Sequence, residues 1–132
     1  MFFVCVLALG AQSVSEDPLL GSPGACNTDL DYAQVRSVTV QQSGDTWRFS
    51  VEVEHHDQGW DHYADRWVVV DPHDGTVYGR RVLAHPHDNE QPFTRSQSGI
   101  SIPSDRDRVL VVAACNVHGF GGCGRIVELP RD

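Results

Sequence analysis

Apolar and polar residues alternate along much of the chain, and the clearest example lies between residues 46 and 54. There the apolar side chains occupy every second position, Trp47, Phe49, Val51 and Val53, and polar side chains fill the positions between them. A period of two places the two sets on opposite faces of an extended strand. This segment therefore predicts a half-buried β-strand.

Further segments have strand character, and residues typical of turns separate them. Continuous apolar runs in 65–71 and 108–114 are typical of central strands that are buried on both faces. The chain contains no amphipathic helical pattern. Short strands joined by turns predict an all-β fold, an immunoglobulin-like antiparallel β-sandwich of about seven strands. The expected strands lie around 38–40 and at 46–55, 65–71, 77–84, 93–102, 108–114 and 125–129.

The N-terminal residues differ in character from the rest. Residues 1–13 begin with a short apolar run and continue with small and polar residues, which is typical of a signal peptide; a buried N-terminal strand is the alternative. Residues 14–33 are expected to form a linker or N-terminal arm, because Ser, Pro, Gly and Asp are frequent there. Residues 34–132 are expected to form the β-sandwich domain. Export would make the protein periplasmic or secreted and place it in an oxidising compartment.

The charge of the chain excludes some classes of partner. Its 18 acidic residues outnumber its 10 basic ones, all of them Arg, and the formal net charge is −8. Binding to nucleic acid needs clustered Lys or Arg, so no nucleic-acid partner is expected. After the N-terminal segment no apolar run approaches the roughly 18 residues of a membrane helix, so no membrane span is expected.

The directions of successive strands predict which loops meet at one end of the sandwich. If strand 46–55 runs upward, the connection after it lies at the upper end, together with those after strands 77–84 and 108–114. The turn at 71–75, which contains His73, then lies at the opposite end. The residues that this topology brings to the upper end are His55, His56, His62, His85, His87, Cys115 and His118.

Imidazoles together with a thiolate form a typical transition-metal site. Imidazole suits iron, copper and zinc, and a thiolate selects against magnesium and calcium. The same topology brings Cys26 and Cys123 to the upper end, so a Cys26–Cys123 disulfide is expected in an exported protein and would leave Cys115 free. The alternative is a disulfide-stabilised interaction sandwich in which Cys115 pairs with Cys123.

Two motifs resemble those of one protein family. The segment Cys115-Asn116-Val117-His118-Gly119 resembles the Cys-Asn-x-His-Gly signature of the superoxide reductases, which include neelaredoxin and the iron domain of desulfoferrodoxin. His56 and His62, followed by Tyr63, resemble the family's pair of His residues spaced by five others and followed by Tyr. The similarity covers roughly residues 50–122.

The resemblance implies a mononuclear iron centre that reduces superoxide to peroxide by one electron, supplied by an external electron donor. It implies Cys115 as the axial thiolate and His118, His56 and His62 as equatorial ligands, with Glu90 as a candidate proton donor. The family's Lys-His-Val-Pro-like segment has no counterpart here, and the chain contains no Lys. A non-catalytic copper or zinc protein on the same scaffold is therefore the alternative function. The candidates for the remaining ligand are His55, His85 and His87.

Overall fold

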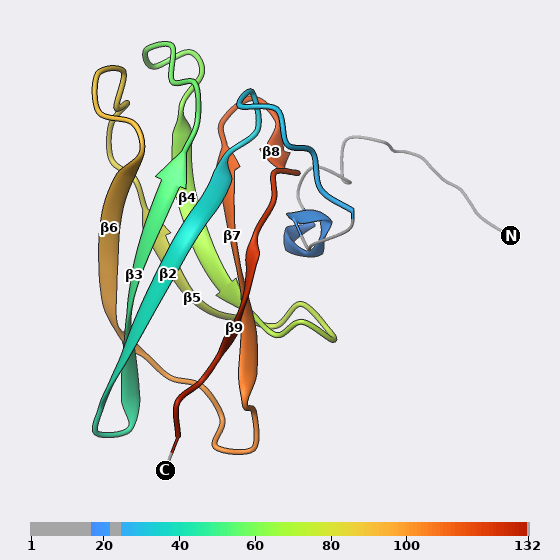
Figure 1. The fold of residues 1–132 in the computed structure, drawn as a ribbon, viewed down its shortest axis with the longest axis vertical. Helices are drawn as coiled ribbons and strands as arrows, with labels where there is room; N and C mark the ends of the chain where they lie inside the picture. The colour runs from blue at the N-terminus through green and yellow to red at the C-terminus, as the bar shows by residue number, and fades with distance from the viewer. Residues whose placement is uncertain (1–16, 22–24, 132) are drawn as a thin grey trace, which may run out of the picture.

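The protein is described here by a computed structural model, which covers residues 17–21 and 25–131. The expected signal peptide at residues 1–13 lies outside the described residues. The described chain forms a β-sandwich with one short 3-10 helix, η2 (Pro18–Gly21), packed against its side (Figure 1). No helix among the described residues is long and apolar enough to cross a membrane.

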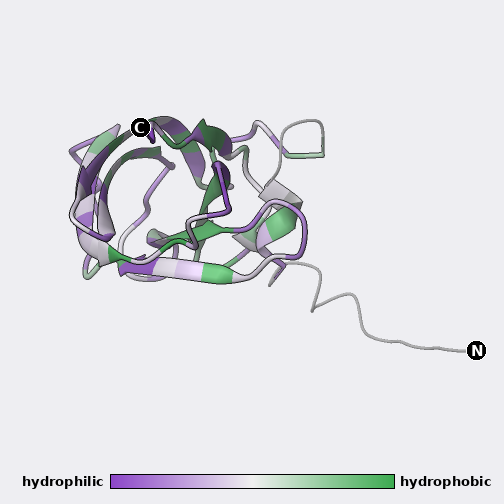
Figure 2. Cartoon of the chain, turned by 90° about the horizontal axis from the view of Figure 1, so that it is seen from below, coloured by the Kyte–Doolittle hydropathy of each residue, from purple (hydrophilic) through white to green (hydrophobic). Residues whose placement is uncertain are grey.

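The strands form two antiparallel sheets, which confirms the predicted fold class. One sheet has the order β2–β3–β6, and the other has the order β5–β4–β7–β8, with β9 also paired to β7. Figure 2 shows the two sheets as facing layers when the molecule is seen from below. The strands are β2 (Gln34–Ser43), β3 (Thr46–Glu54), β4 (Ala64–Val70), β5 (Val77–Val82), β6 (Phe93–Ile100), β7 (Arg108–Cys115), β8 (Gly119–Phe120) and β9 (Arg125–Glu128).

The alternation in β3 fills the space between the sheets. Trp47, Phe49, Val51 and Val53 are all at most 1 % exposed and belong to the main hydrophobic core. They pack with the inward-facing residues of β4 and β7, such as Val111. Burial of these apolar side chains is the main force that holds the two layers together.

The outer face of the second sheet is buried as well. Val68 on β4 and Val112 on β7 belong to a smaller apolar cluster, against which Leu19 of η2 packs. This explains why 67–70 in β4 and 109–114 in β7 are apolar at every position. The sequence predicted two-sided burial of these strands, and η2 supplies part of the second cover.

Three loops meet at the upper end of the sandwich, as the strand directions predicted. They follow β3, β5 and β7, and all three lie at the top of Figure 1. The turn between β4 and β5, which carries the exposed His73, lies away from them.

The N-terminal arm, residues 25–33, is fastened beside this upper end. Cys26 and Cys123 form a disulfide with an S–S distance of 2.07 Å, which confirms the predicted pairing. Cys115 is buried and is the free cysteine among the described residues. The alternative pairing of Cys115 with Cys123 is therefore wrong, because Cys26 already occupies Cys123.

Candidate metal centre

Three side chains that can bind a metal ion come together below the upper loops. The ligating atoms of His55, His62 and Cys115 all lie within 4.8 Å of one another. His55 directly follows β3, His62 lies in the loop between β3 and β4, and Cys115 is the last residue of β7. The two sheets therefore both contribute to the group, and its geometry depends on how they pack.

His55 is held in one orientation by a buried carboxylate. Its side chain is fully buried, and its Nδ1 lies 2.6 Å from Oδ1 of Asp57, which is also buried. Burial opposes protonation of the imidazole, but hydrogen bonds with Asp57 and with the Cys115 sulfur outweigh it and raise the pKa of His55 to about 9. The contact with Asp57 leaves Nε2 of His55 directed at the group, which is the arrangement of a metal-ligating His with a carboxylate partner.

Asp57 has hydrogen-bond partners for both of its oxygens. The amide of Ala64 donates to Oδ1 at 3.0 Å, and the amide of His87 donates to Oδ2 at 2.7 Å. Burial alone would raise the pKa of Asp57, but the hydrogen bonds from His55 and these two amides lower it below its usual value. The carboxylate therefore stays ionised, and it joins the loop after β3 to the loop after β5.

The sulfur of Cys115 is the buried donor at the end of β7. The residue is 1 % exposed, and its Sγ lies 3.7 Å from Nε2 of His62. The amide of His118 donates to this sulfur at 3.2 Å. An amide donor of this kind stabilises negative charge on a sulfur, as around thiolate ligands in metal centres.

The main chain of the arm also reaches the group. The carbonyl oxygen of Asp31 lies 3.2 Å from Nε2 of His55, 3.3 Å from Nε2 of His62 and 3.7 Å from Sγ of Cys115. One oxygen of the arm thus faces all three ligating side chains.

His118 lies next to the group without being one of its three members. Its ring is stacked on Tyr32, with centroids 4.8 Å apart, and meets the ring of His62 edge-on at 5.1 Å. It is half-buried. His118 therefore contributes its amide to Cys115 and its ring to the packing around His62.

The remaining residues expected at the site lie elsewhere at the upper end. His56 is exposed, and its amide donates to the carbonyl of Leu30 in the arm. His85 and His87 contact one another in the loop after β5, with ring centroids 4.5 Å apart. Glu90 pairs with Arg95 at 3.3 Å. The structure thus does not bring these four residues, His56, His85, His87 and Glu90, into the group.

The ring of His87 contacts Phe93 and Arg95, outside the group. Its ring is stacked on Phe93 at 3.8 Å, and the Arg95 guanidinium lies 2.9 Å from its Nε2. Burial and the charge of Arg95 lower the pKa of His87, so the neutral imidazole accepts the hydrogen bond. The loop around His87 supports the group indirectly, because Gln91 accepts a hydrogen bond from the amide of His55 and donates one to the carbonyl of His87.

Sequence reasoning did not identify Asp57 or Asp31. A signal for Asp57 was present, because the period of two that buries Val51 and Val53 continues to His55 and Asp57, which are also buried. The same continuation selects His55 instead of His56 as the inward-facing residue. Asp31 contributes a main-chain atom, and a carbonyl that every residue carries leaves no signature in the sequence.

No protein-family model matches the chain. The chain is 41 % identical over 101 residues to the "Putative lipoprotein" of Halomicrobium mukohataei, an alignment that covers 76 % of this chain and 49 % of that protein. The chain thus spans about half the length of this curated relative.

Solved structures share the fold at low sequence identity. The superoxide reductase (neelaredoxin) of Ignicoccus hospitalis has a TM-score of 0.54 at 13 % identity, covering 84 % of this chain and 94 % of its own. The superoxide reductase of Nanoarchaeum equitans has a TM-score of 0.51 at 14 % identity, covering 79 % and 97 %. A hypothetical protein of Pyrococcus horikoshii OT3 has a TM-score of 0.53 at 17 % identity, covering 79 % and 95 %. The chain is therefore similar in fold to the superoxide reductases, and at this identity the likeness concerns the fold alone.

Proposed function

We propose that this chain is an exported protein that binds a single transition-metal ion through His55, His62 and Cys115 and serves in one-electron chemistry. The observation that carries the proposal is the convergence of two imidazoles and a buried free thiol within 4.8 Å. These residues come from distant parts of the chain, so the fold itself brings them together.

The donor types fit such a metal. Two imidazoles and a thiolate suit iron, copper or zinc, and they disfavour the hard cations that prefer oxygen. The contact between Asp57 and His55 supports the same assignment, because a carboxylate behind a ligating imidazole fixes its tautomer and raises its basicity. Iron or copper held there would supply a change of oxidation state by one electron.

Superoxide reduction is the reaction that the shared fold suggests. In that reaction superoxide takes up one electron and two protons and leaves as hydrogen peroxide, and an external donor must return the electron. Cys115 would hold the metal and supply electron density to it, and the amide of His118 donates to the Cys115 sulfur and would moderate its charge. Asp57 holds His55 in place throughout.

A copper or zinc protein without this reaction is the second candidate. It is favoured by the small number of imidazoles in the group. The resemblance implies four ligating His residues, whereas the group contains His55 and His62, and His56, His85 and His87 lie outside it. The net charge of −8 also opposes the approach of an anionic substrate. The metal itself separates the candidates: superoxide reduction requires a redox-active ion, and zinc would exclude it.

Metal analysis together with an electronic spectrum tests the proposal. The protein purified from its native compartment is expected to contain one metal ion per chain. A thiolate charge-transfer band is expected if that metal is iron or copper, and Cys115→Ser should abolish this band. His73→Ala is the control, because His73 lies at the opposite end and should leave both metal content and spectrum unchanged. A native protein without metal, or equal losses in both variants, would contradict the proposal.

A further inference from the structure

We infer that the main-chain carbonyl of Asp31 is a fourth donor of this centre, and that the disulfide-bonded arm holds it there. The inference rests on the proposed function and specifies its ligand set. Two imidazole nitrogens, one thiolate sulfur and one carbonyl oxygen would then surround the ion.

The distances between the four donor atoms suit one ion between them. Metal–ligand bonds of zinc-like length arranged as a tetrahedron place two nitrogen or oxygen donors about 3.3 Å apart, and a sulfur about 3.6 Å from each of them. The Asp31 oxygen lies 3.2 Å and 3.3 Å from the nitrogens of His55 and His62, and 3.7 Å from the Cys115 sulfur. The sulfur lies 3.7 Å from the His62 nitrogen. Four of the six distances in the donor set are thus within about 0.2 Å of these values. The other two, from the His55 nitrogen to the His62 nitrogen and to the Cys115 sulfur, are at most 4.8 Å.

Hydrogen bonding alone accounts less well for this oxygen. A carbonyl has two lone pairs, yet three potential donors face it from His55, His62 and Cys115. A metal ion between these atoms would bond to the Asp31 oxygen and to each of the three side chains, so the oxygen would need only one partner. The crowding around the Asp31 oxygen therefore has a simple explanation if the ion is its partner.

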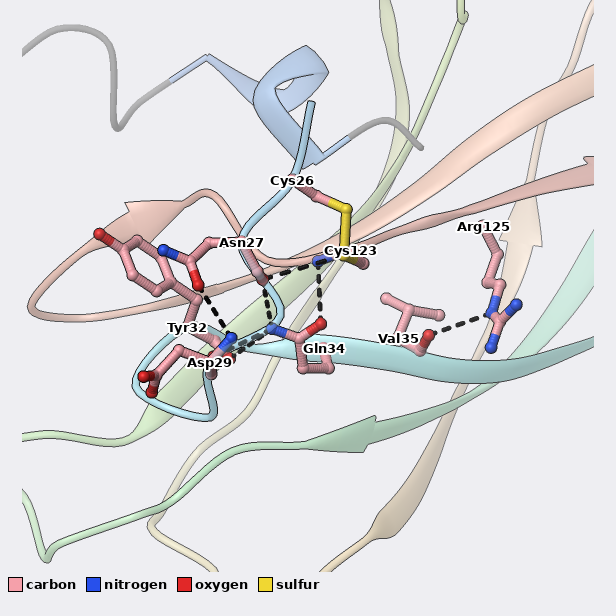
Figure 3. Close-up of a disulfide and its surroundings, with 8 residues drawn as sticks. All are labelled: Cys26, Asn27, Asp29, Tyr32, Gln34, Val35, Cys123 and Arg125. Atoms are coloured by element: carbon pink, nitrogen blue, oxygen red, sulfur yellow. Dashed lines mark hydrogen bonds between the residues drawn. A yellow bond between two sulfur atoms is a disulfide. The ribbon is translucent and has the colours of Figure 1, made fainter. Parts of the chain in front are cut away.

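The arm is built to keep the carbonyl in place. The two N–H groups of the buried Gln34 side chain are shared among the carbonyls of Asn27, Asp29 and Tyr32, and its oxygen accepts from the amide of Cys123 (Figure 3). The Cys26–Cys123 disulfide joins the start of the arm to the same point (Figure 3). One side chain and one covalent bond thus fix both ends of the segment that carries Asp31.

The β8–β9 connection leaves room for the arm only because it carries glycine at Gly121 and Gly122. A Cβ on Gly122 would overlap the carbonyl of Ala33, and one on Gly121 would press on the ring of Tyr32 at 2.8 Å. The amide of Asn27 also donates to the carbonyl of Gly121 at 2.8 Å. The arm therefore packs closely against the β8–β9 connection, and in this position the Asp31 carbonyl faces the group.

A fourth donor from the protein has a consequence for the type of metal centre. Two His, one Cys and a backbone oxygen are a ligand set of copper electron-transfer sites, and four protein donors also suit zinc. Such a centre leaves no position for a coordinated water or substrate. The fourth donor therefore favours electron transfer by copper over direct binding of a substrate to the metal.

Titration with Cu(II) tests the inference on the wild type and on the double variant Cys26→Ser/Cys123→Ser. Loss of the disulfide should release the arm and weaken Cu(II) binding about tenfold or more, the range seen when the support of a metal ligand is removed. The thiolate band should remain, because Cys115 is untouched. Asp71→Asn, which removes a buried carboxylate in the turn after β4, is the matched control and should keep wild-type affinity.

The outcomes separate the inference from the proposed function. A folded double variant with wild-type affinity would overturn the inference and leave the metal site standing. A wild type that binds no Cu(II) with a thiolate band would overturn the inference, and one that binds none of iron, copper and zinc would overturn the proposed function as well. Should the double variant not fold, water-proton relaxation by the Cu(II)-loaded wild type gives the answer: an exchanging water on copper overturns the inference, and its absence supports it.

Discussion

Replacing Asp57 by Asn tests whether this buried carboxylate contributes to metal affinity in addition to folding stability. The carboxylate accepts from Nδ1 of His55 and from the amides of Ala64 and His87, and all three contacts are buried. Asn has the same shape but only one acceptor oxygen. In either orientation of the amide, at least one buried donor loses its partner.

The two orientations of the Asn side chain lead to the same expected loss. If its oxygen faces His55, the amide of His87 meets an NH₂ group, and the charge that raises the basicity of His55 is gone. If its NH₂ group faces His55, Nδ1 must accept and the proton moves to Nε2, the atom that would bind the metal. We expect metal affinity to fall about 10- to 100-fold, as for other carboxylate–imidazole partners. The unsatisfied donor should cost about 1–3 kcal/mol of folding stability.

Asp71→Asn provides a matched control. Asp71 is also buried and also accepts three hydrogen bonds, from the Tyr78 hydroxyl, the His73 amide and Nε of Arg106. This variant should lose a similar amount of stability without changing metal affinity, because Asp71 follows the end of β4 opposite to the one where Ala64 pairs with Cys115.

Competition with a chelator of known affinity measures the metal affinity, and urea unfolding of the metal-free proteins measures the stability. The reasoning would be refuted if folded Asp57→Asn bound metal within threefold of the wild type, or if Asp71→Asn lost as much affinity as Asp57→Asn.

Three further predictions use the same structure. His55→Ala should lower the metal content of the purified protein severely, whereas His56→Ala should not, because only His55 faces the group; equal effects in metal analysis would contradict this. Hydrogen bonds from Tyr78, the His73 amide and Arg106 lower the pKa of Asp71 from 3.8 to about 2, so its ionised form contributes to the stability of the folded state above pH 4. That contribution should disappear as the pH falls from 4 to 2, and the stability difference from Asp71→Asn should shrink with it in urea unfolding; a constant difference would count against it. His118→Ala should reduce metal affinity less than His62→Ala in the same competition assay, since the amide that contacts the Cys115 sulfur is retained; the reverse order would make the His118 ring a ligand.

The sequence contained most of the information on the fold. The alternation of Trp47, Phe49, Val51 and Val53 predicted the inward face of β3, and the strand directions predicted that Cys115 and His73 would lie at opposite ends. These predictions succeeded because burial imposes a strict period on strands that have one face toward a core.

The composition of the metal-binding group was harder to predict. The motif of two spaced His residues followed by Tyr suggested His56 as a ligand. The inward face of β3 instead continues to His55, and the structure brings His55 close to Cys115. The arm contributes a main-chain oxygen of Asp31, for which no residue type is selected. Its approach depends on the hydrogen bonds of Gln34 within the arm and on the absence of a side chain at Gly122, which is distant in the sequence, and neither forms a recognisable motif with Asp31.

The Cys26–Cys123 disulfide also bears on how the chain acquires its native state under oxidising conditions. It links residues 97 positions apart. Closing so long a loop lowers the conformational entropy of the unfolded chain, which stabilises the folded state by about 4–5 kcal/mol. Before β7 has joined its sheet, an oxidant can reach Cys115 as well as Cys26 and Cys123. In the folded structure Cys115 is buried, and among the described cysteines Cys26 and Cys123 are the bonded pair. Correct cysteine pairing therefore depends on the sandwich assembling first, and premature oxidation would trap the chain in a non-native form.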